Sequence, residues 1–414
     1  MSTSVVNALR FNTRIAHGAK HILARDRARA QKLLAGLHAH GPAAFNARKV
    51  SKHHHHGGGQ QQPPTPSPVP PAGDPTASGD SIDVTDAAVT YTMDVGVGQP
   101  PTSYTLLIDT GNWIGADKKY TPTSTSKNTR KQVTVTYGSG SFTGTEFMDQ
   151  VSLGGDLVIQ NQSIGVASSA QGFTDVDGIL GIGPVDLTTG TVQGTTSVPT
   201  VTDNLFSQKI IETESIGISY EPTTSTTNAA NGELTFGTTD PSKFTGEISY
   251  TPITSQSPAS NYWGIDQTLA YGTDTTLLDA QAGIVDTGTT LLLIATDAFQ
   301  AYQKATGATL DNTTGLLTVT EEQFNNMQSM FFQIGSVTYE FTPNAQIWPR
   351  ALNSMLGGQE GKIYLVTADL GSNSGSGLDF INGFAFLQRF YSVYDTTNNR
   401  VGLATTEFTD ATTN

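Results

Sequence analysis

The sequence predicts an all-β body made of two duplicated lobes, with a helical, basic segment in front of it. From about residue 83 onward, short alternating stretches of β-branched and aromatic residues are separated by Gly, Pro and Asn, which is typical of strands and hairpins. This body is about 330 residues long, and a single core rarely grows so large. The motif Asp-Thr-Gly occurs once in each half of the body, as expected of a duplicated unit.

The N-terminal segment, residues 1–52, is expected to be helical and to lie on the body. Residues 7–37 carry a loose apolar stripe with Arg and Lys between its members, which favours an amphipathic helix. Residues 1–80 carry a net charge of +7, whereas the rest of the chain carries −21. An intramolecular partner is therefore favoured over nucleic acid, because the acidic body would repel phosphate. A membrane-surface or calmodulin-like helix is a weaker alternative.

Residues 53–82 are expected to form an exposed linker. Pro and Gly recur every few residues in HHHHGGGQQQPPTPSPVPPAGDPTASGD, so a packed core is implausible and proteases should reach this stretch. We expect the body to divide into an N-terminal lobe, residues 83–252, and a C-terminal lobe, residues 253–414. Helices should be few and short, with candidates at residues 200–208, 296–306 and 320–330.

The composition narrows the possible chemistry of the body. The chain has no Cys, and all eight His precede residue 57. Ser-His-Asp and Cys-His mechanisms and His/Cys zinc sites are therefore excluded from the body, and no metal or cofactor is expected. The acid and base of any enzyme there must be carboxyl groups, Tyr or Lys. No run of 18 apolar residues suggests a transmembrane helix, and the first residues lack the apolar core of a secretory signal.

Asp109 and Asp286 are the candidate catalytic residues. Each follows an apolar stretch, LLI and GIV respectively, and each begins Asp-Thr-Gly; the two lie 177 positions apart. A second echo follows, ILG at 179–181 and ING at 381–383. If the two turns meet at a symmetry axis, the carboxyl groups share one proton, because two like charges so close cannot both ionise. The ionised member can then activate water while the protonated one polarises a carbonyl, which is peptide hydrolysis without histidine.

Several longer motifs resemble those of the pepsin-family aspartic proteases. They are IDTG…WIGA, VTYGSGSFTGTE, VDGILGIGP, NGELTFG, AGIVDTGTTLLLI and FLQRFYSVYDTTNNRVGLA, and the resemblance covers roughly residues 84–410. It implies a bilobal pepsin-like fold with the active-site cleft between the lobes. It also implies these site residues: Asp109 and Asp286 as the catalytic pair; Thr110, Gly111, Thr287, Gly288 and Thr289 in the supporting loops; and Tyr137, Gly138, Ser139, Trp113 and Thr290 at the flap and substrate.

Within this set, the resemblance gives each group a task. The two motif threonines lock the loops across the axis, and Thr289 donates its hydroxyl to its aspartate. The tip of a β-hairpin flap lies at residues 137–139, and Trp113 supports the flap tyrosine. The residues agree, because VTVTYGSGSFTGTE reads as two alternating strands around a Gly/Ser turn.

One departure from the family pattern lies beside Asp109. The family reads D-T-G-S-S-N-x-W, whereas this chain reads Asp-Thr-Gly-Asn-Trp and is three residues shorter. The missing serine would orient Asp109, and the shorter loop should displace Trp113, at a large cost in rate. This motivates the alternative of a catalytically impaired homologue that binds peptide or cell-wall polymer. A two-carboxylate glycosidase is a third alternative, which the paired Asp-Thr-Gly motifs and the flap disfavour.

The resemblance implies an acid endopeptidase that is made as a zymogen and secreted. The basic segment would be a propeptide that lies in the cleft and leaves it when body carboxylates are protonated. We expect protein or peptide substrates with apolar or aromatic side chains beside the scissile bond, inhibition by pepstatin-like compounds, a monomeric state, and no nucleic-acid or membrane partner.

Overall fold

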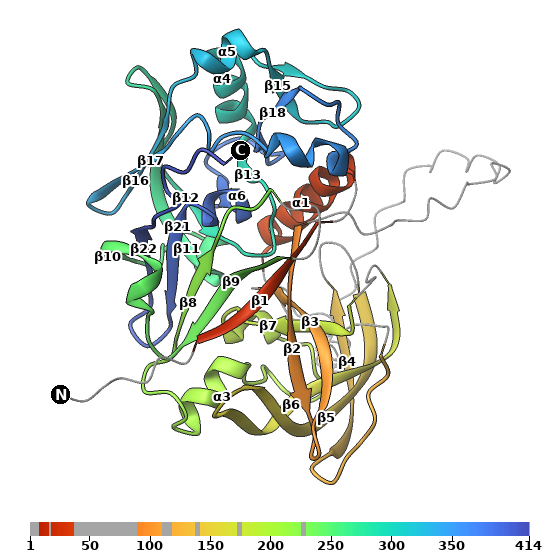
Figure 1. Ribbon diagram of the computed structural model, residues 1–414. Coiled ribbons are helices and arrows are strands. Elements are labelled where there is room, and N and C mark those ends of the chain that lie inside the picture. Colours follow the sequence, from red (N-terminus) through yellow and green to blue (C-terminus); the bar gives the residue numbers. More distant parts are fainter. Residues whose placement is uncertain are drawn as a thin grey trace, which may run out of the picture.

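The structure is a computed structural model whose described part is mostly β with few helices, as the sequence predicts (Figure 1). The predicted linker, residues 53–82, lies outside the described residues. Among the described residues no helix is long and apolar enough to cross a membrane. The described residues are 8–15, 18–36, 89–109, 118–136, 141–171, 176–224 and 229–413, and the side chains of residues 8–15, 89–91, 109, 136, 171, 229 and 230 are not described.

A 12-stranded sheet runs through the described residues and joins both ends of the chain. Its strand order is β10-β22-β21-β8-β9-β1-β2-β3-β7, with β5 pairing β2 and with β4 and β6 flanking β5. The bounds are β1 Ala8–Ile15, β2 Val89–Val97, β3 Thr102–Asp109, β4 Lys127–Thr136, β5 Ser141–Gly154, β6 Leu157–Gln171, β7 Gly178–Gly181, β8 Ser215–Tyr220, β9 Ala229–Phe236, β10 Thr245–Pro252, β21 Phe390–Asp395 and β22 Arg400–Thr405.

The second half of the chain forms two further sheets. The larger has the order β17-β16-β11-β12-β20-β13-β19 and the smaller the order β14-β15-β18. The bounds are β11 Gly264–Tyr271, β12 Thr275–Val285, β13 Leu292–Ile294, β14 Thr309–Leu310, β15 Leu317–Val319, β16 Met330–Ile334, β17 Val337–Phe341, β18 Ile363–Tyr364, β19 Thr367–Asp369 and β20 Phe380–Asn382.

The two strands that lead to Asp109 and Asp286 pair in equivalent ways. β3 ends at Asp109 and pairs in parallel with β7, with Asp109 opposite Gly181. β12 ends just before Asp286 and pairs in parallel with β20, with Val285 opposite Asn382. Parallel pairing of each motif strand with its own later echo is the pairing that a duplicated unit requires.

The predicted single helix over residues 7–37 is wrong in its first third. Ala8–Ile15 is a strand, antiparallel to both β2 and β9, and the helix α1 spans only Ala19–Leu34. Gly18, with φ 108°, separates the two elements. Such an angle is easy for Gly and strained for other residues, so it stops the helix from extending backward. Strand pairing on both sides satisfies the backbone of β1, and this outweighs the helical tendency of the segment.

The remaining helices are short. α3 is Val201–Ser207, α4 is Thr296–Thr306, α5 is Glu321–Asn325 and α6 is Phe384–Leu387. The predictions for residues 200–208 and 296–306 hold. Of the helix predicted over residues 320–330, only the first half is helical, as α5, and Met330 already begins β16.

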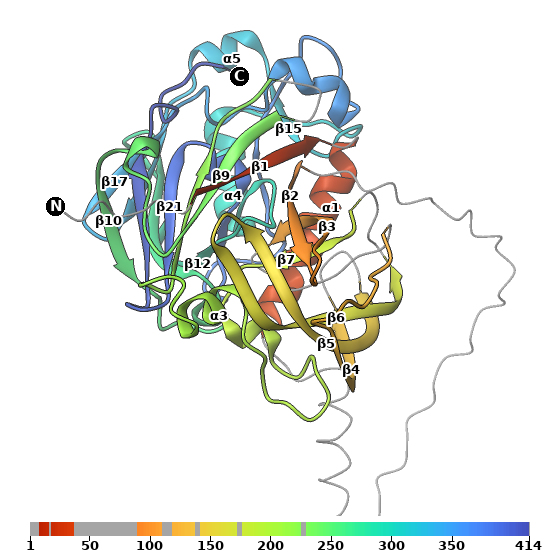
Figure 2. The same ribbon diagram turned by 60° about the horizontal axis from the view of Figure 1, so that its bottom comes forward.

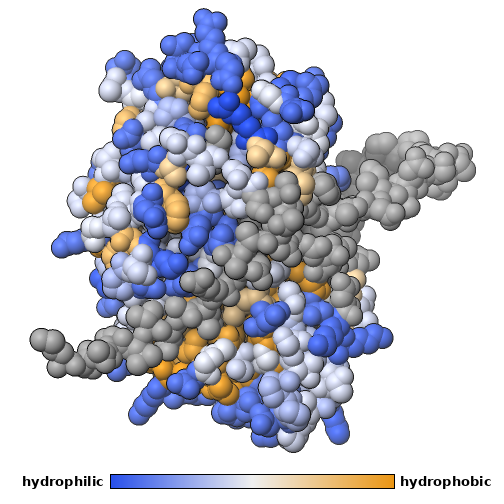
Figure 3. Space-filling model, viewed as in Figure 1, coloured by the Kyte–Doolittle hydropathy of each residue, from blue (hydrophilic) through white to orange (hydrophobic). Residues whose placement is uncertain are grey.

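Helix α1 lies between the two halves of the molecule in both ribbon views (Figures 1 and 2). It contributes Ala19, Ile22, Leu23 and Ala30, all buried, to the main hydrophobic core. Burial of this apolar face stabilises the docked helix by roughly 25 cal/mol per Å² removed from water. The face of the molecule in Figure 3 is largely hydrophilic, with smaller apolar patches in its lower half.

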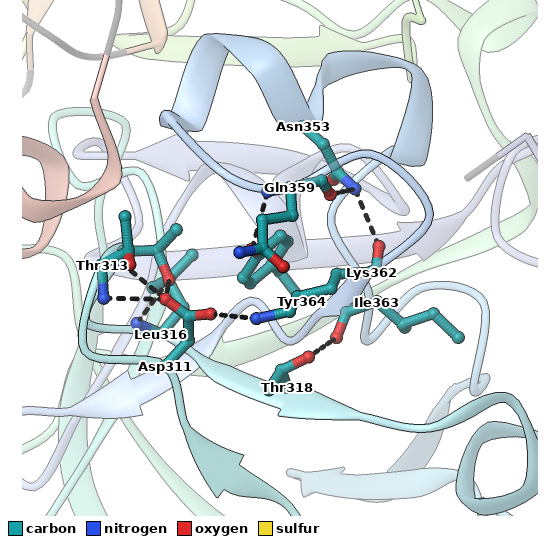
Figure 4. Close-up of polar contacts among 10 residues, drawn as sticks. Asp311, Thr313, Leu316, Thr318, Asn353, Gln359, Lys362, Ile363 and Tyr364 are labelled. Carbon is teal, nitrogen blue, oxygen red and sulfur yellow. Dashed lines mark hydrogen bonds and ion pairs between the residues drawn. The ribbon is translucent and has the colours of Figure 1, made fainter.

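A polar cluster joins the small sheet to the 3-10 helix Arg350–Leu356 (Figure 4). The Asp311 carboxylate accepts N–H bonds from Thr313 and Thr314 at 2.8 and 2.9 Å, and Lys362 Nζ lies 2.6 Å from its second oxygen. These contacts, that of Lys362 foremost, hold the pKa of Asp311 at about 2. The cluster therefore stays charged in moderate acid.

Candidate active site

Asp286 lies in a turn that supplies donors to its carboxylate. The residue follows strand β12, whose last four residues are buried, and is 1% exposed. Its backbone N–H donates to the Asn382 carbonyl at 3.1 Å, which ties the turn to β20. The N–H of Gly288 donates to Oδ1 at 3.2 Å, and the Thr289 hydroxyl donates to Oδ2 at 2.6 Å. Both contacts favour the ionised carboxylate, so this turn holds a negative charge away from water.

Tight backbone packing fixes the same turn from outside. A Cβ on Gly383 would lie 2.3 Å from the Leu291 carbonyl oxygen and 2.6 Å from that of Thr289, so only glycine fits where the second echo meets the motif. Thr287 is 4% exposed, and its hydroxyl has no hydrogen-bond partner among the described residues. A buried hydroxyl normally has such a partner, and the one expected for it, the Thr110 loop, lies outside those residues.

Arg29 of helix α1 binds the Asp286 carboxylate with two hydrogen bonds. Its Nε donates to Oδ2 at 2.7 Å and its Nη2 donates to Oδ1 at 2.8 Å. The Arg29 side chain is 12% exposed and that of Asp286 is 2% exposed. Charge-assisted pairs of this bidentate kind are strong and geometrically specific. In this structure a residue of the basic segment therefore covers both oxygens of the Asp286 carboxylate.

Two neighbours of Arg29 on the helix contact the loop that follows Asp286. Asp26 accepts the N–H groups of Thr290 and Leu291 on Oδ2, at 3.0 and 2.9 Å. Arg25 Nη2 donates to the Thr290 hydroxyl at 3.3 Å. Thr290, expected near the substrate, is 1% exposed in the presence of the helix. The helix thus occupies the backbone donors beside Asp286.

A second ion pair holds α1 at the edge of the site. Arg27 Nε donates to the Asp369 carbonyl at 2.8 Å, and its Nη2 donates to Oδ2 of the same residue at 3.2 Å. This pair is far more exposed, 41% for the Arg27 side chain and 21% for that of Asp369. The N–H of Gly18 also donates to the Met355 carbonyl at 2.6 Å. The docked position of α1 therefore rests on contacts along its length; the Arg29 pair is the more buried of the two described ion pairs with the body, and the Asp26 contacts with Thr290 and Leu291 are buried as well.

The charge of Asp286 also acts on two tyrosines, Tyr262 and Tyr394. Burial, with the negative charge of Asp286 adding to it, raises the pKa of Tyr262 to about 12 against the opposing effect of Arg29. Burial, followed by the Asp286 charge, also raises the pKa of Tyr394. Both phenols therefore stay neutral at any pH at which a carboxyl pair works. Among the described residues no three His, Cys, Asp or Glu side chains converge as metal ligands would.

Of the first motif, the structure describes only the backbone of Asp109. Asp109 ends β3 opposite Gly181 of β7, the place that corresponds to Asp286 beside Gly383. Its side chain is not described. The other site residues predicted around it lie outside the described residues: Thr110, Gly111, Trp113, Tyr137, Gly138 and Ser139.

Comparison with known proteins decides the family. A family model described as eukaryotic aspartyl protease matches residues 90–406. The chain belongs to this family. Polyporopepsin from Irpex lacteus is 62% identical over 339 residues, which cover 81% of this protease and 99% of polyporopepsin. Cathepsin E from Rattus norvegicus is 31% identical over 340 residues, 76% of this protease and 79% of cathepsin E.

A solved structure shows the same fold. The crystal structure of the aspartic proteinase from Irpex lacteus matches with a TM-score of 0.76 at 62% identity, covering 78% of this protease and 96% of that chain. The predicted family, the pepsin-like β fold and the assignment as an aspartic endopeptidase are thereby confirmed, and the catalytic interpretation is supported over the impaired homologue.

Sequence reasoning missed the residues that the helix brings to the site. A basic segment was expected to lie in the cleft, but Arg25, Asp26 and Arg29 were not singled out, nor was Tyr262 of the body. The spacing of Arg25 and Arg29, one helical turn apart, was the available signal. Nothing in the sequence distinguishes Arg29 from the other arginines of the segment.

Proposed function

We propose that Asp109 and Asp286 form the catalytic pair of an acid endopeptidase, and that the chain with docked α1 is its inactive precursor. The observation that carries this proposal is the bidentate Arg29 contact on a buried, donor-rich Asp286. A carboxylate buried in this way at the end of a strand is expensive to maintain without a function. The equivalent backbone placement of Asp109 supports the second member of the pair.

In the proposed mechanism, the two carboxyl groups share one proton and hold a water molecule. The ionised carboxylate takes a proton from the water as its oxygen attacks the peptide carbonyl carbon, and the other carboxyl gives its proton to the carbonyl oxygen. The C–N bond then breaks as the nitrogen accepts a proton from one carboxyl group, while a hydroxyl of the tetrahedral intermediate returns its proton to the other carboxylate and becomes the new carboxyl C=O, which restores the shared proton. Donors to Asp286 from Gly288 and Thr289 keep it oriented through both steps. The flap at residues 137–139 would close over the substrate.

The same contacts explain why the precursor would have no hydrolytic activity and how acid would activate it. While Arg29 occupies both oxygens of Asp286, the carboxylate cannot accept a proton from water. Protonation of Asp286 removes one acceptor and the ion pair, which weakens docking of α1. Cleavage within residues 53–82, the linker predicted from the sequence, would make release permanent.

The finer features of the assignment rest on the family resemblance. We infer protein or peptide substrates with apolar or aromatic side chains beside the scissile bond, sensitivity to pepstatin-like inhibitors, a monomer, and no nucleic-acid or membrane partner. We also infer secretion, for which Asn161-Gln-Ser163 and Asn312-Thr-Thr314 would be glycosylation sites. Lobes at residues 83–252 and 253–414 remain our proposed division.

The test is hydrolysis of denatured haemoglobin at acid pH, with and without a pepstatin-type inhibitor, by the protein before and after removal of residues 1–82. We expect inhibitor-sensitive hydrolysis that requires both Asp109 and Asp286. A folded, segment-free protein without such activity would instead support the peptide- or polymer-binding alternative, which the shortened loop after Asp109 motivates.

A further inference from the structure

We propose that Asp26 is a proton-operated latch, which makes helix α1 dock most tightly at moderately acid pH rather than at neutral pH. The proposal rests on the proposed function, because it concerns how the precursor is held closed. It adds a second proton-binding group, on the helix itself, whose effect on docking is opposite to that of Asp286.

The geometry around Asp26 is suited to a carboxyl group that is protonated when the helix is docked. The residue is 0% exposed. Oδ2 accepts the N–H groups of Thr290 and Leu291, whereas Oδ1 is buried without a hydrogen-bond partner among the described residues. The nearest described cation to Oδ1 is Arg25, whose Nη2 is 3.8 Å away. A proton on Oδ1 therefore costs no existing hydrogen bond and removes a buried charge that is offset at Oδ1 by a 3.8 Å ion pair with Arg25.

The charged groups facing Asp26 do not cancel this preference. Arg25 of α1 and the two N–H donors favour the ionised form, while Asp286 in the loop opposite disfavours it. Arg29, the other cation at this position, is engaged with Asp286. Burial is the largest influence, and the net result is a pKa for Asp26 of about 6 in the docked helix, against an ordinary value of 3.8.

The sign of the effect on docking follows from that difference. A carboxyl group whose pKa is higher when docked binds more protons in the docked state, so docking strengthens as pH falls from about 7 toward 4. A difference of about 2 pKa units corresponds to about a 100-fold change in the docking equilibrium. In stronger acid the activation step proposed above breaks the Arg29–Asp286 pair, and docking weakens again. With the Asp26 latch, docking of α1 is therefore strongest at an intermediate pH. Without it, docking would weaken steadily as pH falls.

The absence of Cys in the chain provides a direct assay. Ala30 is 0% exposed in the docked helix, so Ala30→Cys places a single thiol that a pyridyl disulfide reaches only when the helix lifts. The full-length chain carries Asp109→Asn as well, to prevent self-cleavage during the measurement. Labelling rates from pH 2.5 to 7.5 are normalised to the denatured chain at the same pH.

We expect the slowest labelling between about pH 4 and 6, with faster labelling on both sides. Asp26→Asn, which mimics the protonated carboxyl, should slow labelling at pH 7.5 by about 10- to 100-fold and flatten the profile above pH 4.5. Asp369→Asn is the matched control: it removes the same charge, yet it takes away the partner of Arg27 and should speed labelling at pH 7.5.

Two results would overturn the latch. One is labelling of the parent chain that rises steadily from pH 7.5 to pH 4, which needs no variant to fold. The other is Asp26→Asn labelling at pH 7.5 as fast as the parent or faster. Because the thiol assay does not involve hydrolysis, a peaked docking profile in a protein without inhibitor-sensitive haemoglobin cleavage would refute the proposed function and leave the latch standing.

Discussion

Replacing Arg29 with Gln should release the active site at a pH where the native precursor is silent. Arg29 donates two bonds of 2.7 and 2.8 Å to a carboxylate whose side chain is 2% exposed. Breaking a buried pair of this kind costs about 3–5 kcal/mol. Asp286 keeps its contacts with Gly288 and Thr289 and gains water once the helix lifts, so we expect about 2–3 kcal/mol of lost docking energy. At about 1.4 kcal/mol per factor of ten, that is roughly a 30- to 150-fold larger open fraction.

The assay is the initial rate of peptide hydrolysis at pH 6 by freshly prepared precursor, before any N-terminal cleavage is visible on a gel. Arg27→Gln is the control, since it removes the same charge from the same helix. Its pair with Asp369 is 41% and 21% exposed, and such exposed pairs contribute about 0–1 kcal/mol. Equal initial rates for the two variants would refute the reasoning, because the buried contact would then hold the helix no better than the exposed one.

Three further predictions concern the site and the stability of the body. Thr289→Val removes the 2.6 Å hydrogen bond to Asp286. In segment-free enzyme, kcat should fall about 10- to 100-fold, and the acid limb of the pH–rate profile should move to higher pH because the ionised carboxylate loses a donor. Thr289→Ser keeps the donor and should preserve both kcat and the profile. Burial, together with a hydrogen bond that protonated Glu214 donates to Asp203, raises the pKa of Glu214 to about 7. The stability that this protonated form contributes is lost as pH rises through 7, so Glu214→Gln should flatten the decline of Tm between pH 5 and 8; an unchanged decline would contradict this. Lys362→Met should lower Tm at pH 5, because Lys362 is the main cause of the low pKa of Asp311, and the deficit should vanish as pH falls through about 2; a deficit independent of pH would exclude the ion pair as its source.

The sequence predicted the duplicated β body because its signals are local. Each Asp-Thr-Gly follows an apolar strand, and β3 with β7 and β12 with β20 pair as the echoes indicate. The error over residues 7–37 has a local cause as well. Apolar or β-branched residues occupy every second position from Leu9 to Ile15, with Arg or Asn between them, and this period of two indicates a strand. The apolar residues of β1 and α1 were read together as one helical stripe, and this concealed the strand pattern.

The contacts of helix α1 could not be predicted in the same way. Arg29 and Asp286 are 257 positions apart, and which arginine meets the carboxylate depends on the position of Gly18 and on how Ile22 and Ala30 pack in the core. Burial of Asp26 is a consequence of that packing. A lone Asp in a basic helix reads from the sequence as a solvent-exposed residue.

The measurement that tests the catalytic pair most directly is a crystal structure of the segment-free protein with a pepstatin-type inhibitor bound. Our account predicts that the side chains of Asp109 and Asp286 approach to about 3 Å and that both contact the inhibitor hydroxyl group. Carboxyl groups lying apart in separate cores, or an inhibitor bound away from them, would contradict it.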